Sequence, residues 1–225
     1  MNNYLARILV ILLATTMIAS SAAVVYGLDD IGTVHAAERP VIVLDPGHDS
    51  THTGAAANGI NEETVTLAIA LACKSELEKY SCDVYMTRDG AACVNGGGSV
   101  RAVTCNTARA ALAASKGASV YVSFHLNSAA SSAANGAEVW CSTAYEDSAT
   151  GASSKSLASK ILGQLVKAGM GNRGIKYANH TVTLNTNASG IPSCLIEHGF
   201  IQNAHDAAFF KSAEGQATLG AADAK

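Results

Sequence analysis

Three apolar runs of the chain each end in a residue that can bind a metal or move a proton. The run VIVL leads into Asp45–His48, the run VYVSF leads into His125, and the run CLI leads into Glu197. In open α/β sheets, binding and catalytic sites are built in the crevice beyond the carboxyl ends of the strands. We therefore expect these three segments to meet at one edge of a sheet.

A further carboxylate completes a catalytic set. Glu62 follows Asn61, a residue type that favours the N-cap of a helix. Two imidazoles and one carboxylate are a common ligand set for catalytic zinc, which keeps a fourth position for water. We predict that His48, Glu62 and His125 bind Zn²⁺, and that Glu197 acts as the general base in hydrolysis of an unactivated amide.

The residues alone leave alternatives open for each member of this set. His52 could replace His48 as a ligand, and Glu63 could replace Glu62 at the start of the helix. His125 could instead be a hydrogen-bonded core histidine. Glu197 lies among apolar residues, where a carboxylate is costly unless it is paired or coordinated, so a buried structural salt bridge is its alternative role.

The elements that would position these residues alternate between strands and helices. We predict a single α/β domain with a mixed, mainly parallel sheet of about six strands flanked by helices. The predicted strands are Val41–Leu44, Asp83–Thr87, Ser119–Phe124, Glu138–Cys141, Thr181–Leu184 and Ser193–Ile196. The predicted helices are Glu62–Lys79, Val100–Ala114, Ser156–Lys167 and a short one from His205.

Composition narrows the classes of protein to consider. The chain has 225 residues, of which 48% are hydrophobic and 15% charged, so disorder, collagen and coiled coil are excluded. A formal net charge of −3 gives no electrostatic footprint for nucleic acid or for an anionic membrane surface. A chain of this size buries enough surface to fold without a partner, and we expect a monomer.

The N-terminal residues resemble an export signal. A positively charged start is followed by the apolar run Ile8–Ile18 and by Val34-His35-Ala36, an A-x-A-like cleavage sequence. We predict that residues 1–36 are an export signal and that residues 37–225 are the catalytic domain. The alternative is an uncleaved membrane anchor, since the apolar stretch continues through Val24 and Val25. With the signal cleaved, we expect a secreted or cell-envelope protein, in the periplasm or cell wall, without stable membrane association.

All six cysteines lie in the part of the chain predicted to be exported, where disulfides can form. Their spacings contain no C-x-x-C, which disfavours a zinc ribbon or a thioredoxin-like site. Six cysteines allow 15 pairings, which the sequence does not resolve. We predict structural disulfides, and a buried or disulfide-bonded role for Cys194 rather than a nucleophilic one.

In their joint order and spacing, six segments resemble the zinc-dependent N-acetylmuramoyl-L-alanine amidases that cut peptidoglycan. The resemblance extends from Pro40 to about Phe210. The segments are VIVLDPGH at Val41–His48, Glu62 with Leu67, DVYMTRDG at Asp83–Gly90, VSFHLNS at Val122–Ser128, RGIK at Arg173–Lys176 and PSCLIEHGFIQN at Pro192–Asn203. The resemblance implies that His48, Glu62 and His125 bind zinc, that Glu197 is the catalytic glutamate, and that peptidoglycan is the substrate.

A few positions depart from the usual pattern of that family. Asp49-Ser50 stands where a pair of glycines is common, and His198 where a small or hydroxyl residue is common. We expect these changes to alter loop shape, and we expect His198 to add a protonatable group near the site. The proposed ligands are all retained.

The resemblance implies cleavage of the amide bond between N-acetylmuramic acid and L-alanine. The alternatives are a catalytically inactive wall-binding domain of the same fold, a zinc peptidase acting on a stem-peptide bond, and a membrane-tethered interaction protein. Ligands specify a reaction type better than they specify a substrate.

Overall fold

The structure is a computed structural model that describes residues 26–28, 34–36, 39–95 and 101–225. The chain divides into two compact units, Met1–Arg39 and Pro40–Lys225. In the first unit, β1 (Tyr26–Leu28) and β2 (Val34–Ala36) form an antiparallel pair. Most of the predicted export signal lies outside the described residues and stays a prediction. Within the described residues, none of the helices could span a lipid bilayer.

The second unit contains a six-stranded sheet in the order β6-β3-β7-β10-β8-β9. Its strands are β3 (Val41–Pro46), β6 (Asp83–Met86), β7 (Val120–Asn127), β8 (Ala137–Cys141), β9 (Asn172–Tyr177) and β10 (Ser193–Phe200). Strands β6, β3, β7 and β10 are parallel, β8 is antiparallel to β10, and β9 is parallel to β8. The predicted mixed, mainly parallel α/β sheet is confirmed.

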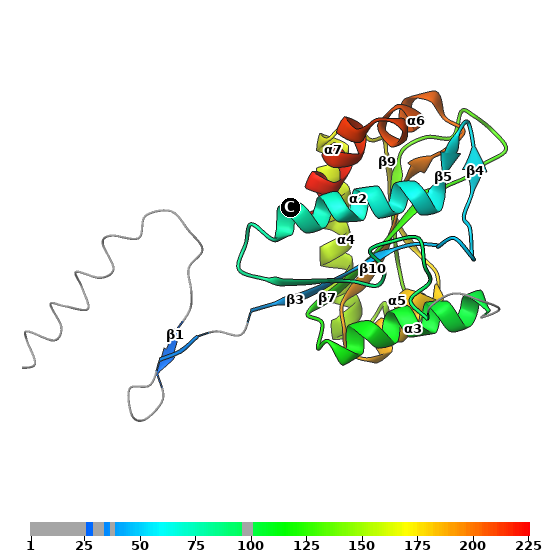
Figure 1. The fold of residues 1–225 in the computed structure, drawn as a ribbon. Helices are drawn as coiled ribbons and strands as arrows, with labels where there is room; N and C mark the ends of the chain where they lie inside the picture. The colour runs from blue at the N-terminus through cyan, green and yellow to red at the C-terminus, as the bar shows by residue number, and fades with distance from the viewer. Residues whose placement is uncertain (1–25, 29–33, 37–38, 96–100) are drawn as a thin grey trace, which may run out of the picture. The chain divides into compact units, whose positions relative to one another are not determined.

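Helices cover both faces of this sheet (Figure 1). They are α2 (Glu62–Leu77), α3 (Ala102–Ser115), α4 (Ala149–Lys167), α5 (Thr181–Ala188), α6 (Ala204–Lys211) and α7 (Ala213–Asp223), with the short 3₁₀ turn η1 (Thr143–Tyr145). The helices α2, α4 and α7 pack on one face over a large apolar cluster, and α3 and α5 pack on the other over a smaller one. The short hairpin β4 (Ala56–Ala57) and β5 (Ile60–Asn61) precedes α2.

Alternation along the central strands assigns each side chain to one of these faces. On β7, Val122 and Phe124 belong to the cluster under α2, α4 and α7, whereas Tyr121 belongs to the cluster under α3 and α5. Successive side chains of a strand point to opposite faces. His125 therefore points to the face of Tyr121, and Glu197 points to the same face because it pairs in register with His125 on β10.

One predicted strand is wrong. Thr181–Leu184 is the first half of α5, and the sixth strand is instead β9. The β-branched residues of this segment favour a strand locally. In the structure, Val182, Thr183, Thr186 and Asn187 are buried, which is the spacing of one helix face. Tertiary packing against α3 therefore overrides the local preference.

The sequence pattern did not reveal β9 because this edge strand has no apolar alternation. It begins with exposed Asn172 and Arg173, and Gly174 has a φ of 87°. The C-terminal part also holds more helix than the short one predicted, since α6 and α7 together fill residues 204–211 and 213–223.

Candidate active site

His48, Glu62 and His125 converge on one point although they come from three separate elements. His48 follows β3, Glu62 begins α2, and His125 lies near the end of β7. One ligand atom from each residue lies within 4.8 Å of the others. Glu62 Oε1 lies 3.3 Å from His48 Nε2 and 3.1 Å from His125 Nδ1. The structure thus brings together the three residues predicted from the sequence as ligands.

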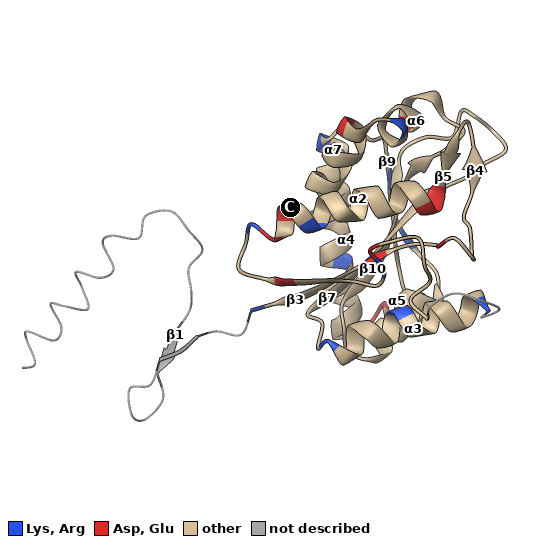
Figure 2. Ribbon diagram, in the orientation of Figure 1, with Lys and Arg blue, Asp and Glu red and all other residues tan. Residues whose placement is uncertain are grey.

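Backbone groups hold the carboxylate of Glu62 in place. Glu62 Oε1 accepts a hydrogen bond from the Leu126 N–H at 3.0 Å, and Oε2 accepts one from the Ala55 N–H at 2.8 Å. The first turn of α2 is acidic and appears red at the start of that helix in Figure 2. The positive end of the helix dipole favours negative charge there. Glu62 is therefore fixed as a buried carboxylate beside two imidazoles.

The loop after β3 fixes the orientation of His48. Its backbone lies in the left-handed region, with a φ of 60°, which is uncommon for a residue other than glycine. The His48 Nδ1 atom lies 3.1 Å from the carbonyl oxygen of His52. Because a carbonyl can only accept, Nδ1 donates this hydrogen bond, and Nε2 is the ring nitrogen that faces the carboxylate of Glu62.

Gly47 allows the His48 loop to pass close to His125. A Cβ atom at this position would lie 2.4 Å from both Cε1 and Nε2 of His125 and 2.7 Å from the carbonyl oxygen of Phe124. Such distances are well inside van der Waals contact, so a side chain at residue 47 must displace the His125 ring or the strand that carries it. Gly47 is thus a steric requirement of the site.

We predict that Gly47→Ala weakens binding of a divalent cation to the His48–Glu62–His125 set by about tenfold or more, because a small displacement of a ligand is costly in a metal site. The measurement is a zinc titration of purified protein. Gly90→Ala is the matched control, since a Cβ at residue 90 meets nothing within 4 Å. Equal zinc affinity in Gly47→Ala and wild-type protein would contradict the steric role.

Glu197 lies next to this group on the neighbouring strand. It pairs in register with His125 on one side and with Glu138 on β8 on the other. In the described part of the chain, its Oε2 atom is buried and has no hydrogen-bond partner. Burial raises the pKa of Glu197, and the neighbouring carboxylates of Glu62 and Glu138 raise it further. The Glu197 carboxylate is therefore a stronger base than an exposed glutamate.

Glu138 lies beside Glu197 on the neighbouring strand β8 and has polar partners of its own. Glu138 is buried, accepts a hydrogen bond from Asn127 Nδ2 at 2.8 Å and forms an ion pair with Arg173 Nε at 2.8 Å. The sequence pattern does not mark Glu138 or Arg173 as site residues. The strand-end position of Glu138 relative to Glu197 depends on the antiparallel pairing of β8, which no single segment reveals.

A buried ionic network holds the loop that carries His48. The Arg109 guanidinium on α3 contacts Asp45 at 2.7 Å and Asp49 at 3.2 Å, and it donates a hydrogen bond to the carbonyl oxygen of His48 at 2.7 Å. All three charged side chains are almost fully buried. Arg88 adds hydrogen bonds to the carbonyl oxygens of Pro46 and Gly47. The position of His48 therefore depends on cations that come from distant parts of the sequence.

The lowered pKa of Asp45 makes the stability of the folded protein depend on pH in the acid range. Burial raises the pKa of Asp45, but the Arg109 charge and hydrogen bonds from Ser123 and Thr87 outweigh burial and lower it from 3.8 to about 2. A group whose folded pKa is depressed contributes stability above its unfolded pKa and loses it as the pH falls through its folded pKa.

We predict that Asp45 contributes about 2 kcal/mol to the free energy of unfolding at neutral pH, and that this contribution disappears between about pH 4 and about pH 2. The measurement is urea unfolding followed by circular dichroism across this range. Asp45→Asn should remove this part of the pH dependence, whereas Asp147→Asn, at an exposed position, should retain it. An unchanged pH profile in Asp45→Asn would exclude this role.

A cavity of about 290 Å³ opens beside the two imidazoles, on the sheet face covered by α3 and α5. His48, His125, Asn106, Asn179, His180 and Leu195 contribute to its walls. The His180 ring stands edge-on to Trp140 at a centroid distance of 5.4 Å, and within the described residues its buried Nε2 atom has no partner. The cleft thus has polar walls next to the converging ligand atoms.

The alternative ligands named from the sequence lie elsewhere. His52 groups with Asp49, Cys93 and Cys105 rather than with Glu62 and His125. Glu63 is outside both of the clusters found among the described residues. His198 does not add a protonatable group to the cleft: it is fully buried, stacks on Phe124 and contacts Asp223 at 2.9 Å. Its neighbour Glu197 points to the opposite face of the same strand.

Comparison with known proteins identifies the class that this fold and this site define. A sequence profile of the N-acetylmuramoyl-L-alanine amidase family matches residues 42–225. An endolysin of Bacillus phage SPP1 is 34% identical over 172 residues, which cover 76% of this chain and 58% of the endolysin. N-acetylmuramoyl-L-alanine amidase LytC of Bacillus subtilis is 33% identical over 173 residues, which cover 76% of this chain and 32% of LytC.

Solved structures agree with the sequence comparison. The catalytic domain of CwlV, an N-acetylmuramoyl-L-alanine amidase from Paenibacillus polymyxa, superposes with a TM-score of 0.66 at 29% identity, covering 82% of this chain and 95% of that one. AmiC2 of Nostoc punctiforme gives a TM-score of 0.68 at 26% identity, covering 82% and 93%. The chain belongs to the N-acetylmuramoyl-L-alanine amidase family. It spans 58% of the length of the endolysin and 32% of the length of LytC.

Proposed function

We propose that the protein is a zinc-dependent hydrolase that cleaves the amide bond between N-acetylmuramic acid and L-alanine in peptidoglycan. The observation that carries this proposal is the convergence of His48, Glu62 and His125 within 4.8 Å, with Glu197 in register beside His125. Family membership supports the same reaction. The reacting amide would enter the cleft of about 290 Å³ that opens beside the imidazoles.

The donor set fits zinc. Two imidazole nitrogens and one carboxylate oxygen match the ligands of catalytic zinc, and the single buried carboxylate gives the site a negative charge. The environment lowers the pKa of Glu62: burial opposes this shift, and the His125 and His48 imidazoles outweigh burial. When bound, the zinc ion supplies Lewis acidity that polarises the carbonyl and activates water.

The residues of the chain then perform the proton transfers. The carboxylate of Glu197, which has no ion-pair partner among the described residues, takes a proton from the attacking water. The raised pKa of Glu197 suits this role, because a stronger base keeps the proton until the leaving nitrogen requires it. His48 and His125 keep their orientation, and the buried Nε2 of His180 provides a polar contact for the bound substrate in the cleft wall.

The wall-binding alternative differs from this proposal in what it requires of Glu197. An inactive wall-binding domain has no need for an unpaired acid next to three convergent ligands. Among the described residues, Glu197 forms no ion pair that would lock it in a structural role. This favours an enzyme. A peptidase acting on a stem-peptide bond would use the same residues, so only the products distinguish it from the amidase.

Export and partners belong to the same proposal. Peptidoglycan lies outside the cytoplasmic membrane, so an enzyme that cuts it must be exported, as the N-terminal signal in residues 1–36 predicts. We propose a monomer in the cell envelope or the surrounding medium, with peptidoglycan as its partner and no role for nucleic acid. A retained N-terminal segment in the mature protein would instead support a membrane-tethered form.

Incubation of the purified protein with peptidoglycan tests the proposed reaction. We expect new L-alanine amino termini, no new reducing sugar ends, and no products when a chelator is present unless zinc is restored. Mass spectrometry of the released peptides separates the amidase from a stem-peptide peptidase, since the amidase releases peptides that begin with L-alanine. New reducing ends without amino termini would replace the proposal with a glycosidase.

A further inference from the structure

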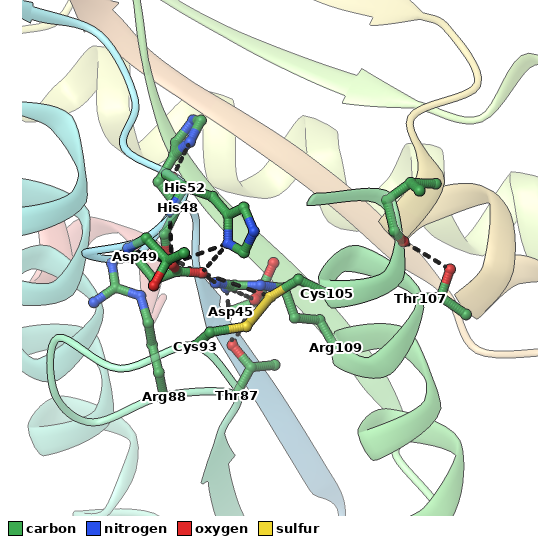
Figure 3. Close-up of a disulfide and its surroundings, with 12 residues drawn as sticks. Asp45, His48, Asp49, His52, Thr87, Arg88, Cys93, Cys105, Thr107 and Arg109 are labelled. Carbon is green, nitrogen blue, oxygen red and sulfur yellow. Dashed lines mark hydrogen bonds and ion pairs between the residues drawn. A yellow bond between two sulfur atoms is a disulfide. The ribbon is translucent and has the colours of Figure 1, made fainter. Parts of the chain in front are cut away.

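A second group of side chains that carry metal-ligand atoms lies close to the loop of His48 (Figure 3). Asp49, His52, Cys93 and Cys105 each offer a ligand atom, and these atoms lie within 4.8 Å of one another. Asp49, Cys93 and Cys105 are buried, and the side chain of His52 is 17% exposed. They come from three parts of the chain: the loop after β3, the loop after β6, and α3.

In the structure, Cys93 and Cys105 are joined by a disulfide. Other contacts also fix the residues around these two sulfur atoms. Cys105 lies within the first turns of α3, and its Sγ atom is 3.5 Å from Asp49 Oδ2. Arg109, one turn further along α3, is anchored to Asp45 and Asp49. Reduction therefore leaves Cys105 held close to Asp49.

His52 is held toward the same point. Asp49 Oδ1 accepts hydrogen bonds from the backbone N–H of His52 at 2.9 Å, and the His52 Nδ1 atom lies 3.1 Å from both carboxylate oxygens of Asp49. A carboxylate that orients a histidine ring is a recurrent feature of metal sites. The ring and the carboxylate are thus already arranged next to the two sulfur atoms.

We propose that the reduced protein binds a second zinc ion through Cys93, Cys105, His52 and Asp49, separately from the His48–Glu62–His125 set. Two sulfur, one nitrogen and one oxygen donor suit tetrahedral zinc, and sulfur donors disfavour magnesium and calcium. The same two cysteines therefore have two mutually exclusive states: a disulfide under oxidising conditions and a zinc site after reduction.

The change between these states balances in atoms and charge. A dithiol reductant transfers two electrons and two protons to the disulfide, which gives two cysteine thiols and the cyclic disulfide of the reductant. Zinc then displaces the two thiol protons to solvent. Two thiolates and one Zn²⁺ sum to zero charge, as the disulfide does. The net charge next to the buried group of Arg109, Asp45 and Asp49 is therefore the same in both states.

Cobalt binding tests this proposal without using enzymatic activity. The full chain carries His125→Ala to remove the first site, and it is reduced with a dithiol that is then removed. We expect about one equivalent of Co²⁺ to bind with the near-ultraviolet thiolate-to-cobalt absorption that marks sulfur ligands. The disulfide form of the same protein should show no such band.

Variants assign the ligands. Cys93→Ser and Cys105→Ser should each reduce the band strongly, and His52→Ala should weaken cobalt binding by about 100-fold. Cys73→Ala is the matched control, because Cys73 is a buried free cysteine outside the cluster, and it should retain the full band. A reduced protein without the band, or a band unchanged in Cys93→Ser, would overturn the second site. Peptidoglycan hydrolysis by the disulfide form of the wild-type protein tests the first site independently.

Discussion

Replacing Glu197 with glutamine is expected to lower kcat/KM for peptidoglycan hydrolysis by about 10³-fold, while the fold and zinc binding are retained. Glutamine has nearly the same shape but cannot take a proton from water. Glu197 has a buried Oε2 atom without a partner, so the substitution breaks no ion pair among the described residues. Its removal should therefore affect the chemical step rather than stability. The measurements are release of L-alanine amino termini, zinc content and thermal unfolding.

Glu63→Gln is the matched control for this experiment. Glu63 neighbours Glu62 in the first turn of α2, and its side chain is not among the converging ligands. We expect this variant to keep nearly full activity. If Glu63→Gln were inactive and Glu197→Gln active, the assignment of the acids would be wrong. If both variants were active, the reaction would proceed without either acid.

Replacing Arg109 with methionine is expected to destabilise the protein by about 3–5 kcal/mol. The substitution keeps much of the side-chain volume but removes the cation between Asp45 and Asp49, which are both buried. Two carboxylates then lose their nearest charge partner in a site that water scarcely reaches. Urea unfolding measures this loss, and zinc titration should show weaker binding because Arg109 also holds the His48 carbonyl group.

An exposed cation provides the comparison for Arg109. Lys160 lies on the exposed side of α4, and Lys160→Met should change the free energy of unfolding by less than about 0.5 kcal/mol. The double variant with Asp45→Asn should be less destabilised than the sum of the two single changes, because the two residues form one pair. Additive effects would mean that the contact between Arg109 and Asp45 contributes little.

The site residues that could be predicted from the sequence are those that directly follow an apolar strand. The segments around His48, His125 and Glu197 each follow an apolar run, and parallel β3, β7 and β10 bring those ends to one edge of the sheet. Glu62 was recognisable because it begins a helix after a residue type that favours the N-cap position. Its contact with the two imidazoles then depends on how α2 packs against β7.

Other features depend on contacts between distant residues and leave no local pattern. The Arg109–Asp45 pair joins residues 64 positions apart, so neither residue marks the other in the sequence. The pairing of Cys93 with Cys105 depends on the placement of the loop after β6 against α3, and it is the one disulfide among the described residues. Structural disulfides were predicted, but which cysteines pair required the fold.

The most direct test of the proposed function is a crystal structure of the zinc-loaded protein with anomalous diffraction recorded on both sides of the zinc absorption edge. We predict an anomalous peak bonded to His48 Nε2, His125 Nδ1 and Glu62, with Glu197 facing the open coordination position. Loss of this peak in Glu62→Gln crystals would support the assignment. A zinc ion bound elsewhere, with these three side chains unliganded, would contradict it.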